Sequence, residues 1–165
     1  MGDDVDLHRS RTGAGRTRAR PQLADSDRAF IKMAASSGLA EIQLGKLAAE
    51  RADNREVRDV AKRLEKDHTQ GDLELLKILD AQRINISRDM GPYQMAAAEL
   101  TKLSGVEFDR AYLRHMVKEH EEAVAQFAAE VKEGRHPELK AYAAKVLPML
   151  QEHLQLAHDL AAKYQ

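Results

Sequence analysis

The sequence predicts an all-α protein, an antiparallel up-down-up-down four-helix bundle. Three observations predict it. Apolar residues make up 43% of the 165 residues and aromatic residues only 4%, which favours helices, because strands draw on β-branched and aromatic residues. Four long stretches repeat apolar residues at spacings of three and four, as one face of a helix does. Only a few residues separate the first stretch from the second and the third from the fourth, which requires antiparallel neighbours.

The balance of charge and the lack of long apolar runs exclude several kinds of partner. The chain has 26 Lys and Arg against 27 Asp and Glu, and such a mixed surface gives no general attraction to nucleic acid or membrane. No apolar run approaches the roughly 18 residues that span a bilayer. The absence of cysteine excludes disulfides and thiolate metal ligands. We expect no nucleic-acid partner and no membrane span, while a homo-oligomer stays open.

Residues 1–22 are expected to form a disordered tail ahead of one bundle domain over residues 23–165. Three Asp and then five Arg dominate this tail, and a segment with so little apolar surface cannot offset its chain entropy by burial. A basic arm for nucleic acid or acidic lipid is the alternative. The tail lacks the aromatic residues that stack on bases, so we favour a solvated segment.

The first long helix is expected over residues 25–51, with Asp25 or Ser26 as its cap. The second should begin at Asp53, which has Glu56 three residues later in the capping-box position, and should extend to about Ile84.

Residues 85–104 form the longest connection. Gly91-Pro92 breaks the helical pattern, but Tyr93 to Leu103 can still make a short extra helix that covers one end of the bundle.

The third long helix should start at Ser104, which has Glu107 in the capping-box position, and should end near Gly134 as a left-handed terminator. Pro137 suits the first turn of the fourth long helix. Pro148 lies inside that helix and removes one of its backbone hydrogen bonds.

Each of the four long helices carries one polar residue on its apolar face: Glu41, His68, His120 and His153. At 1.5 Å per residue the three histidines fall within about one turn of each other, with Glu41 a turn lower. Several unpaired polar groups in a core would cost several kcal/mol, so they must bond to one another, trap water or bind an ion. Three neutral imidazoles and a carboxylate suit zinc, iron, manganese or copper.

Four acids lie beside these positions and are secondary candidates, as further ligands or as hydrogen-bond acceptors behind the histidines. Asp67, Glu119 and Glu152 each directly precede one of the histidines. Glu65 stands three residues before His68, a spacing that lets both side chains reach one ion. The alternatives are that these acids are solvated charges and that the cluster is a metal-free polar network.

Four segments together point to a known family. They are AEIQLGKLA (40–48), KDHTQ (66–70), LSGVEFDRAYLRHMVKEHEEAV (103–124) and VLPMLQEHLQLA (146–157). These segments resemble the bacterial "domain of unknown function 4142" family, whose members are often labelled predicted outer-membrane proteins. The resemblance implies a ferritin-like four-helix fold, usually behind an export signal, with no established activity. It carries over Glu41, Asp67, His68, His120 and His153.

The chain departs from that picture in two places. It has no apolar segment of the kind found in export signals, so a periplasmic location is expected from the resemblance alone and the cytoplasm stays open. Leu150 stands three residues before His153, where the di-iron pattern of ferritins requires Glu. Iron oxidation in the ferritin manner is therefore not expected.

We expect a small helical protein that binds a single transition-metal ion, with zinc and iron among the candidates, in metal handling or stress tolerance. The expected ligands are Glu41, His68, His120 and His153. One alternative is a non-enzymatic structural or interaction module whose metal-free polar core fixes the helix register. Another is a weak oxidase or hydrolase built on the same cluster. Nucleophilic catalysis has no support, since cysteine is absent and no Ser-His-Asp arrangement stands out.

Overall fold

The computed structural model describes residues 23–164, and this part of the chain contains five α-helices, one short 3-10 helix and no strand. The all-α prediction is confirmed, including the extra helix in the longest connection. The predicted disordered tail, residues 1–22, lies outside the described residues. The elements are α1 (Asp25–Arg51), α2 (Arg55–Ala81), η1 (Gly91–Tyr93), α3 (Gln94–Leu100), α4 (Gly105–Glu133) and α5 (Pro137–Ala162).

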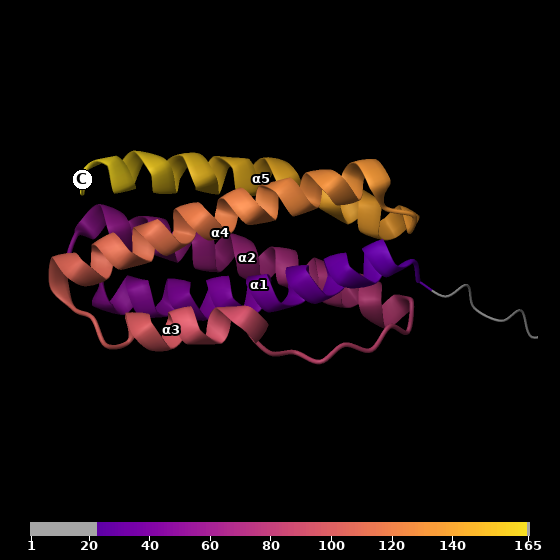
Figure 1. The fold of residues 1–165 in the computed structure, drawn as a ribbon, viewed down its shortest axis with the longest axis horizontal. Helices are drawn as coiled ribbons and strands as arrows, with labels where there is room; N and C mark the ends of the chain where they lie inside the picture. Colours follow the sequence, from indigo (N-terminus) through magenta and orange to yellow (C-terminus); the bar gives the residue numbers. More distant parts are fainter. Residues whose placement is uncertain (1–22, 165) are drawn as a thin grey trace, which may run out of the picture.

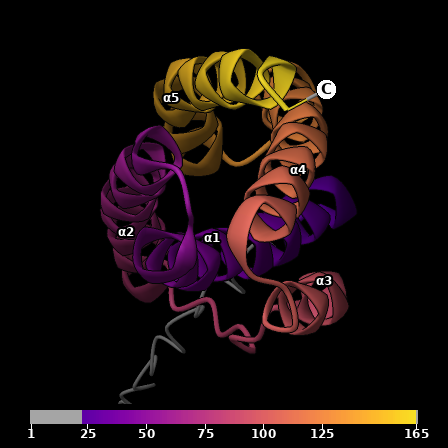
Figure 2. The same ribbon diagram turned by 90° about the vertical axis from the view of Figure 1, so that its left-hand side faces the viewer.

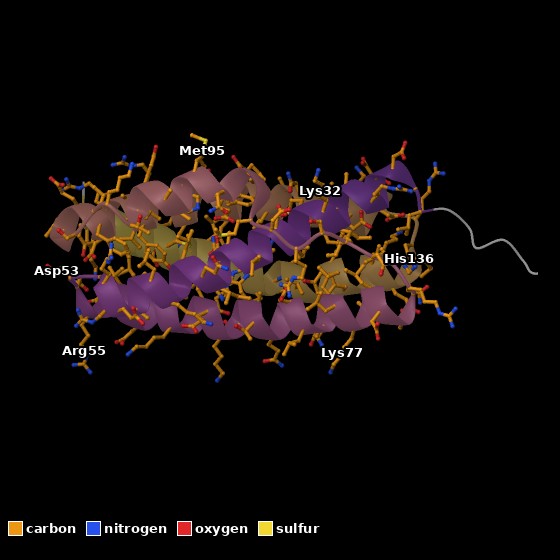
Figure 3. The ribbon with its side chains drawn as sticks, turned by 90° about the horizontal axis from the view of Figure 1, so that it is seen from below. Lys32, Asp53, Arg55, Lys77, Met95 and His136 are labelled. Atoms are coloured by element: carbon orange, nitrogen blue, oxygen red, sulfur yellow. The ribbon has the colours of Figure 1, made fainter. Side chains whose placement is uncertain are left out.

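The four long helices lie side by side, and the short α3 lies outside them (Figures 1 and 2). Packing is closest between α1 and α2 and between α4 and α5, and contacts of α1 with α4 and of α2 with α5 complete the set. Charged side chains such as Arg55 and Lys77 project outward from α2 (Figure 3). None of the helices in residues 23–164 has the length and apolar character needed to cross a bilayer.

The second long helix, α2, begins at Arg55, two residues later than predicted. Asn54, not Asp53, is the N-cap of α2, and its side chain accepts a hydrogen bond of 2.7 Å from the N–H of Glu56. The N–H of Asp53 donates instead to the buried carboxylate of Asp109, at 2.8 Å. A hydrogen bond to α4, which is distant in the sequence, therefore holds Asp53 outside α2.

The end of α2 also comes earlier than predicted, at Ala81 rather than near Ile84. Arg83 adopts a left-handed backbone with φ of 54°, and the N–H of Ile84 bonds to the carbonyl of Leu79 at 2.8 Å. This is the geometry of a helix end that usually carries glycine.

Gly134 ends α4 as predicted, but for a different reason. Its φ is −58°, which any residue can adopt, so the prediction of a left-handed terminator was wrong. A Cβ at this position would lie 2.5 Å from the carbonyl oxygen of Glu130. Glycine is needed here for space.

Two apolar clusters fill the core, and a polar layer separates them. On α4, Ala123 belongs to one cluster and Met116 to the other, with the buried His120 between them. The same order holds on α1, α2 and α5, where Glu41, His68 and His153 lie between residues of the two clusters. The polar layer is therefore enclosed above and below by apolar side chains.

Candidate metal centre

Three histidines from three helices meet in the polar layer. One ring nitrogen each from His68, His120 and His153 lies within 4.8 Å of the others, and the ring centroids are 5.2 to 5.7 Å apart. The three residues are 8%, 1% and 0% exposed. They form the only group in residues 23–164 whose ligand atoms are close enough for three side chains to hold one ion.

His120 is held in one tautomer by its own helix. Its Nδ1 lies 2.8 Å from the carbonyl oxygen of Met116. A carbonyl only accepts, so Nδ1 carries the proton and Nε2 keeps a free lone pair. Nε2 is buried and has no hydrogen-bond partner among the described residues.

His153 is oriented in the same way by Asp67. Its Nε2 donates to Oδ2 of Asp67 at 2.8 Å, which leaves Nδ1 unprotonated. Within the described part of the chain this Nδ1 has no hydrogen-bond partner. Asp67 is thus the hydrogen-bond acceptor of His153. A carboxylate behind an imidazole fixes the ring and raises its basicity as a ligand, and a role of Asp67 behind a metal ligand stays a prediction.

His68 completes the group from α2, and its Nε2 likewise lacks a hydrogen-bond partner in residues 23–164. Burial lowers the pKa of His68 well below its ordinary value, with the neighbouring histidines adding to the effect. Burial also lowers the pKa of His120 to about 4 and lowers that of His153, although Asp67 acts in the opposite direction. All three rings are therefore neutral at neutral pH, which is the form that binds metal.

Glu41 lies in the polar layer but outside the group of three histidines. Its carboxyl group faces Glu119 of α4, and burial, followed by the charge of Glu119, raises the pKa of Glu41. No described residue donates a hydrogen bond to either carboxylate oxygen of Glu41. When protonated, Glu41 can itself donate to Glu119. Its predicted role as a metal ligand stays a prediction.

Glu119 is the centre of a second polar group beside the histidines. Ser37 donates to its Oε1 at 3.1 Å, and Nε2 of His115 lies 2.9 Å from its Oε2. Burial alone would raise the pKa of Glu119, but the facing carboxyl group of Glu41, when protonated, and the neighbouring His115 hold it below its ordinary value. Sequence reasoning missed His115, although its spacing of four residues from Glu119 was a usable signal.

The remaining secondary candidates lie outside the group of three histidines. Glu152 is 56% exposed and forms an ion pair with Arg63 at 2.6 Å. Glu65 is half-buried and lies against Gly45 of α1. A Cβ added to Gly45 would lie 3.1 Å from the Cβ of Glu65. Each of the two has a contact of its own that accounts for its position.

Comparison with known proteins assigns the chain to one family, which is described without an activity. The family described as "Domain of unknown function (DUF4142)" matches residues 12–160. No curated protein matches the sequence.

Solved structures of similar fold include two DUF305 proteins. One is a fragment from Deinococcus radiodurans, 17% identical, with a TM-score of 0.75, covering 87% of this chain and 99% of its own. The other comes from Streptomyces coelicolor and is described as a proposed secreted protein. It is 18% identical, with a TM-score of 0.71. The match covers 84% of this chain and 93% of that one.

A third solved structure is CopM in its Cu(II)-bound form, 16% identical, with a TM-score of 0.67. The match covers 84% of this chain and 97% of that one. At this level of identity, all three structures show a shared helical fold and no more.

Proposed function

Because the chain belongs to the DUF4142 family, whose description names no activity, we propose its function from the site itself. The protein holds a single transition-metal ion through His68, His120 and His153. One observation carries this proposal: each of these buried rings has one nitrogen without a hydrogen-bond partner in residues 23–164, in a group whose ligand atoms lie within 4.8 Å of one another.

The cost of three unsatisfied nitrogens supports an ion over an empty core. Each buried polar atom without a partner costs about 1–3 kcal/mol, and a bound ion would remove all three costs together. Three nitrogens on one tetrahedral zinc ion, each at about 2.0–2.1 Å, lie about 3.4 Å from one another. Since the observed limit is 4.8 Å, the rings need to close by up to about 1.4 Å to bind the ion.

Enclosure supports holding an ion over turning over a substrate. Three protein ligands leave the fourth position of a tetrahedral ion open, as in catalytic sites. However, the histidines lie between two apolar clusters and are at most 8% exposed, and a substrate would have to cross this enclosure to reach that position. The proposed role is therefore metal handling, with tolerance of metal stress as its consequence for the cell.

Copper joins zinc and iron as a candidate ion. The CopM structure is named for its Cu(II)-bound form, and sites of nitrogen ligands bind Cu²⁺ more tightly than other divalent ions of the first transition row. A location outside the cytoplasm is proposed with it, supported by the description of the Streptomyces coelicolor neighbour as a proposed secreted protein.

We propose in addition that the four long helices run up-down-up-down, as in ferritin-like bundles. The short connections at residues 52–54 and 134–136 support this order, since a helix that returns after a few residues must run antiparallel to its predecessor.

The proposal is tested by metal content and by melting temperature. Protein purified without a His tag is loaded with Cu²⁺ or Zn²⁺, dialysed and analysed for metal. We expect one ion per chain and a melting temperature that rises with metal concentration, because the ion binds the folded state. His120→Ala should lose the ion. His158→Ala is the matched control, since His158 is 53% exposed on α5.

The metal-free alternative keeps one supporting observation. The ring bonds of His120 to Met116 and of His153 to Asp67 would also hold the side chains in a polar core that fixes helix register. If wild-type protein binds no stoichiometric Cu²⁺ or Zn²⁺, metal binding is excluded. His120→Ala should then change stability alone.

A further inference from the structure

A small cavity adjoins His68. It has room for about 20 Å³, enough for roughly one water molecule. All four long helices contribute to its wall, and His68, Asp72 and Tyr142 are its polar members of greatest interest. The innermost of these, His68, belongs to the proposed metal centre.

Asp72 is the unusual residue of this cavity. It lies one helical turn after His68 on α2, is 9% exposed, and its Oδ1 has no hydrogen-bond partner among residues 23–164. A buried carboxylate oxygen left without a donor is costly unless a cation or water reaches it. The oxygen is thus available to a visiting cation.

Arg88 pairs with Asp72, a residue of the cavity wall. Its Nη2 donates to Oδ2 of Asp72 at 2.6 Å, and the arginine side chain is 35% exposed while that of Asp72 is 9% exposed. Arg88 belongs to the connection between α2 and α3, which runs along the outside of α1 (Figure 1). The ion pair therefore has one partner that solvent reaches, Arg88, and one buried partner, Asp72.

Two glycines keep the path beside Asp72 open. A Cβ at Gly38 would lie 3.5 Å from Oδ1 of Asp72, and one at Gly71 would lie 4.0 Å from the hydroxyl of Tyr142. Both are ordinary contact distances, so alanine would fit there but larger side chains would fill the space that now adjoins the carboxylate.

We propose that Asp72 is a capture site for the incoming metal cation and that Arg88 closes the access route to the histidines. The cation displaces the guanidinium group from Asp72, crosses the cavity and reaches His68. This inference rests on the proposed metal binding at the three histidines. It adds a second, transient site on the same ion's path.

The test measures rates of loading and release as well as affinity. The probe is Cu²⁺, followed by stopped-flow quenching of tyrosine fluorescence in a chain with four Tyr and no Trp; release is followed after addition of a chelator. Asp72→Asn keeps the shape and removes the charge, and should slow both loading and release by about tenfold. Its equilibrium affinity should stay within a few-fold of wild type, because the capture site alters the barrier.

Arg88→Gln should act in the opposite direction and speed both rates several-fold, because it removes the cation that competes for Asp72. The matched controls are Asp80→Asn and Lys77→Gln, which remove the same charges from exposed positions of α2 away from the cavity. A residue that only supported the fold would not give opposite effects in these two variants. Circular dichroism and melting curves verify that each variant is folded.

The outcomes separate the two proposals. If wild type binds neither Cu²⁺ nor Zn²⁺, both proposals fail. If wild type binds Cu²⁺ but Asp72→Asn and Arg88→Gln load at the rates of their controls, the access route is wrong while the metal centre stands. A loss of affinity in Asp72→Asn with an unchanged loading rate would also overturn the capture role.

Discussion

At the scale of single residues, the three histidines have depressed pKa values, and this has a consequence for the metal-free protein. Between their depressed values and about 6.5 the unfolded chain binds protons that the folded chain does not, because burial lowers the pKa of His68, His120 and His153. Stability contributed by neutral histidines is therefore complete above about pH 6.5 and falls as the pH falls below it.

The first prediction isolates His120 from other titrating groups. Wild type and His120→Gln are compared by urea unfolding between pH 7 and pH 4. The advantage of wild type should shrink by up to about 1.4 kcal/mol per pH unit from about pH 6.5 down to about pH 4, where the pKa of His120 lies. Carboxyl groups also titrate in this range, but they are present in both proteins and cancel in the difference. A difference that is constant with pH would contradict the prediction.

The second prediction concerns Glu41, whose pKa is raised by burial and by Glu119. Above about pH 4.5 the unfolded chain releases a proton that the folded chain keeps, so the wild-type carboxyl lowers stability as the pH rises. Glu41→Gln removes this effect and should stabilise the metal-free protein at pH 7, and by less near pH 4.5; the measurement is urea unfolding at the two pH values.

The same Glu41→Gln variant tests the ligand role predicted from the sequence. If the three histidines suffice, its affinity for Cu²⁺ stays within a few-fold of wild type. A loss of about a hundredfold would make Glu41 a fourth ligand. Glu152→Gln is the control for both measurements, because Glu152 is 56% exposed.

At the scale of the elements, the end of α2 holds strain that a single substitution can remove. Arg83 has φ of 54°, a region that costs a non-glycine residue about 1 kcal/mol. The third prediction is that Arg83→Gly stabilises the protein by about 0.5–1 kcal/mol, measured by urea unfolding. Arg83→Ala retains the strained backbone and should show no such gain.

At the scale of the whole molecule, each of the two short turns between long helices is bound by a buried aspartate from another helix. Asp27 of α1 accepts the backbone N–H groups of Arg135 and His136 in the turn before α5, at 3.1 to 3.2 Å. Asp109 of α4 does the same for the turn between α1 and α2, at 2.8 Å for both N–H groups. It also accepts the hydroxyl of Tyr164 at 3.1 Å. Each carboxylate replaces backbone partners that a short turn cannot supply.

The fourth prediction is that Asp109→Ala destabilises the protein by about 3 kcal/mol or more, because the N–H groups of Asp53 and Asn54 and the hydroxyl of Tyr164 lose a charged acceptor. At roughly 2–4 °C per kcal/mol, the melting temperature should fall by about 10 °C. Asp59→Ala is the control, since Asp59 is 61% exposed in a surface pair with Arg55. A fall of similar size in the control would refute the role assigned to Asp109.

The helices themselves were predictable, because apolar spacing reports which face of each helix is buried. That pattern also located His68, His120 and His153 on buried faces, and counting residues brought them to one level. Helix ends were less predictable. The start of α2 depends on a hydrogen bond to Asp109, a residue more than fifty positions away in the sequence. Glycine is required at position 134 because the carbonyl oxygen of Glu130 leaves no space for a Cβ.

By itself, the amino-acid sequence determined the all-α class, the buried faces and the presence of a polar layer, because these depend on local spacing and on the cost of burying polar groups. The tertiary structure alone decided how that layer is divided: three imidazoles in one group, Glu41 turned to Glu119, and Asp72 paired with Arg88. Spacing along one helix defines a face, but side-chain partners across the core depend on the rotation and axial shift between helices. Those two quantities are set by the packing of all the side chains together.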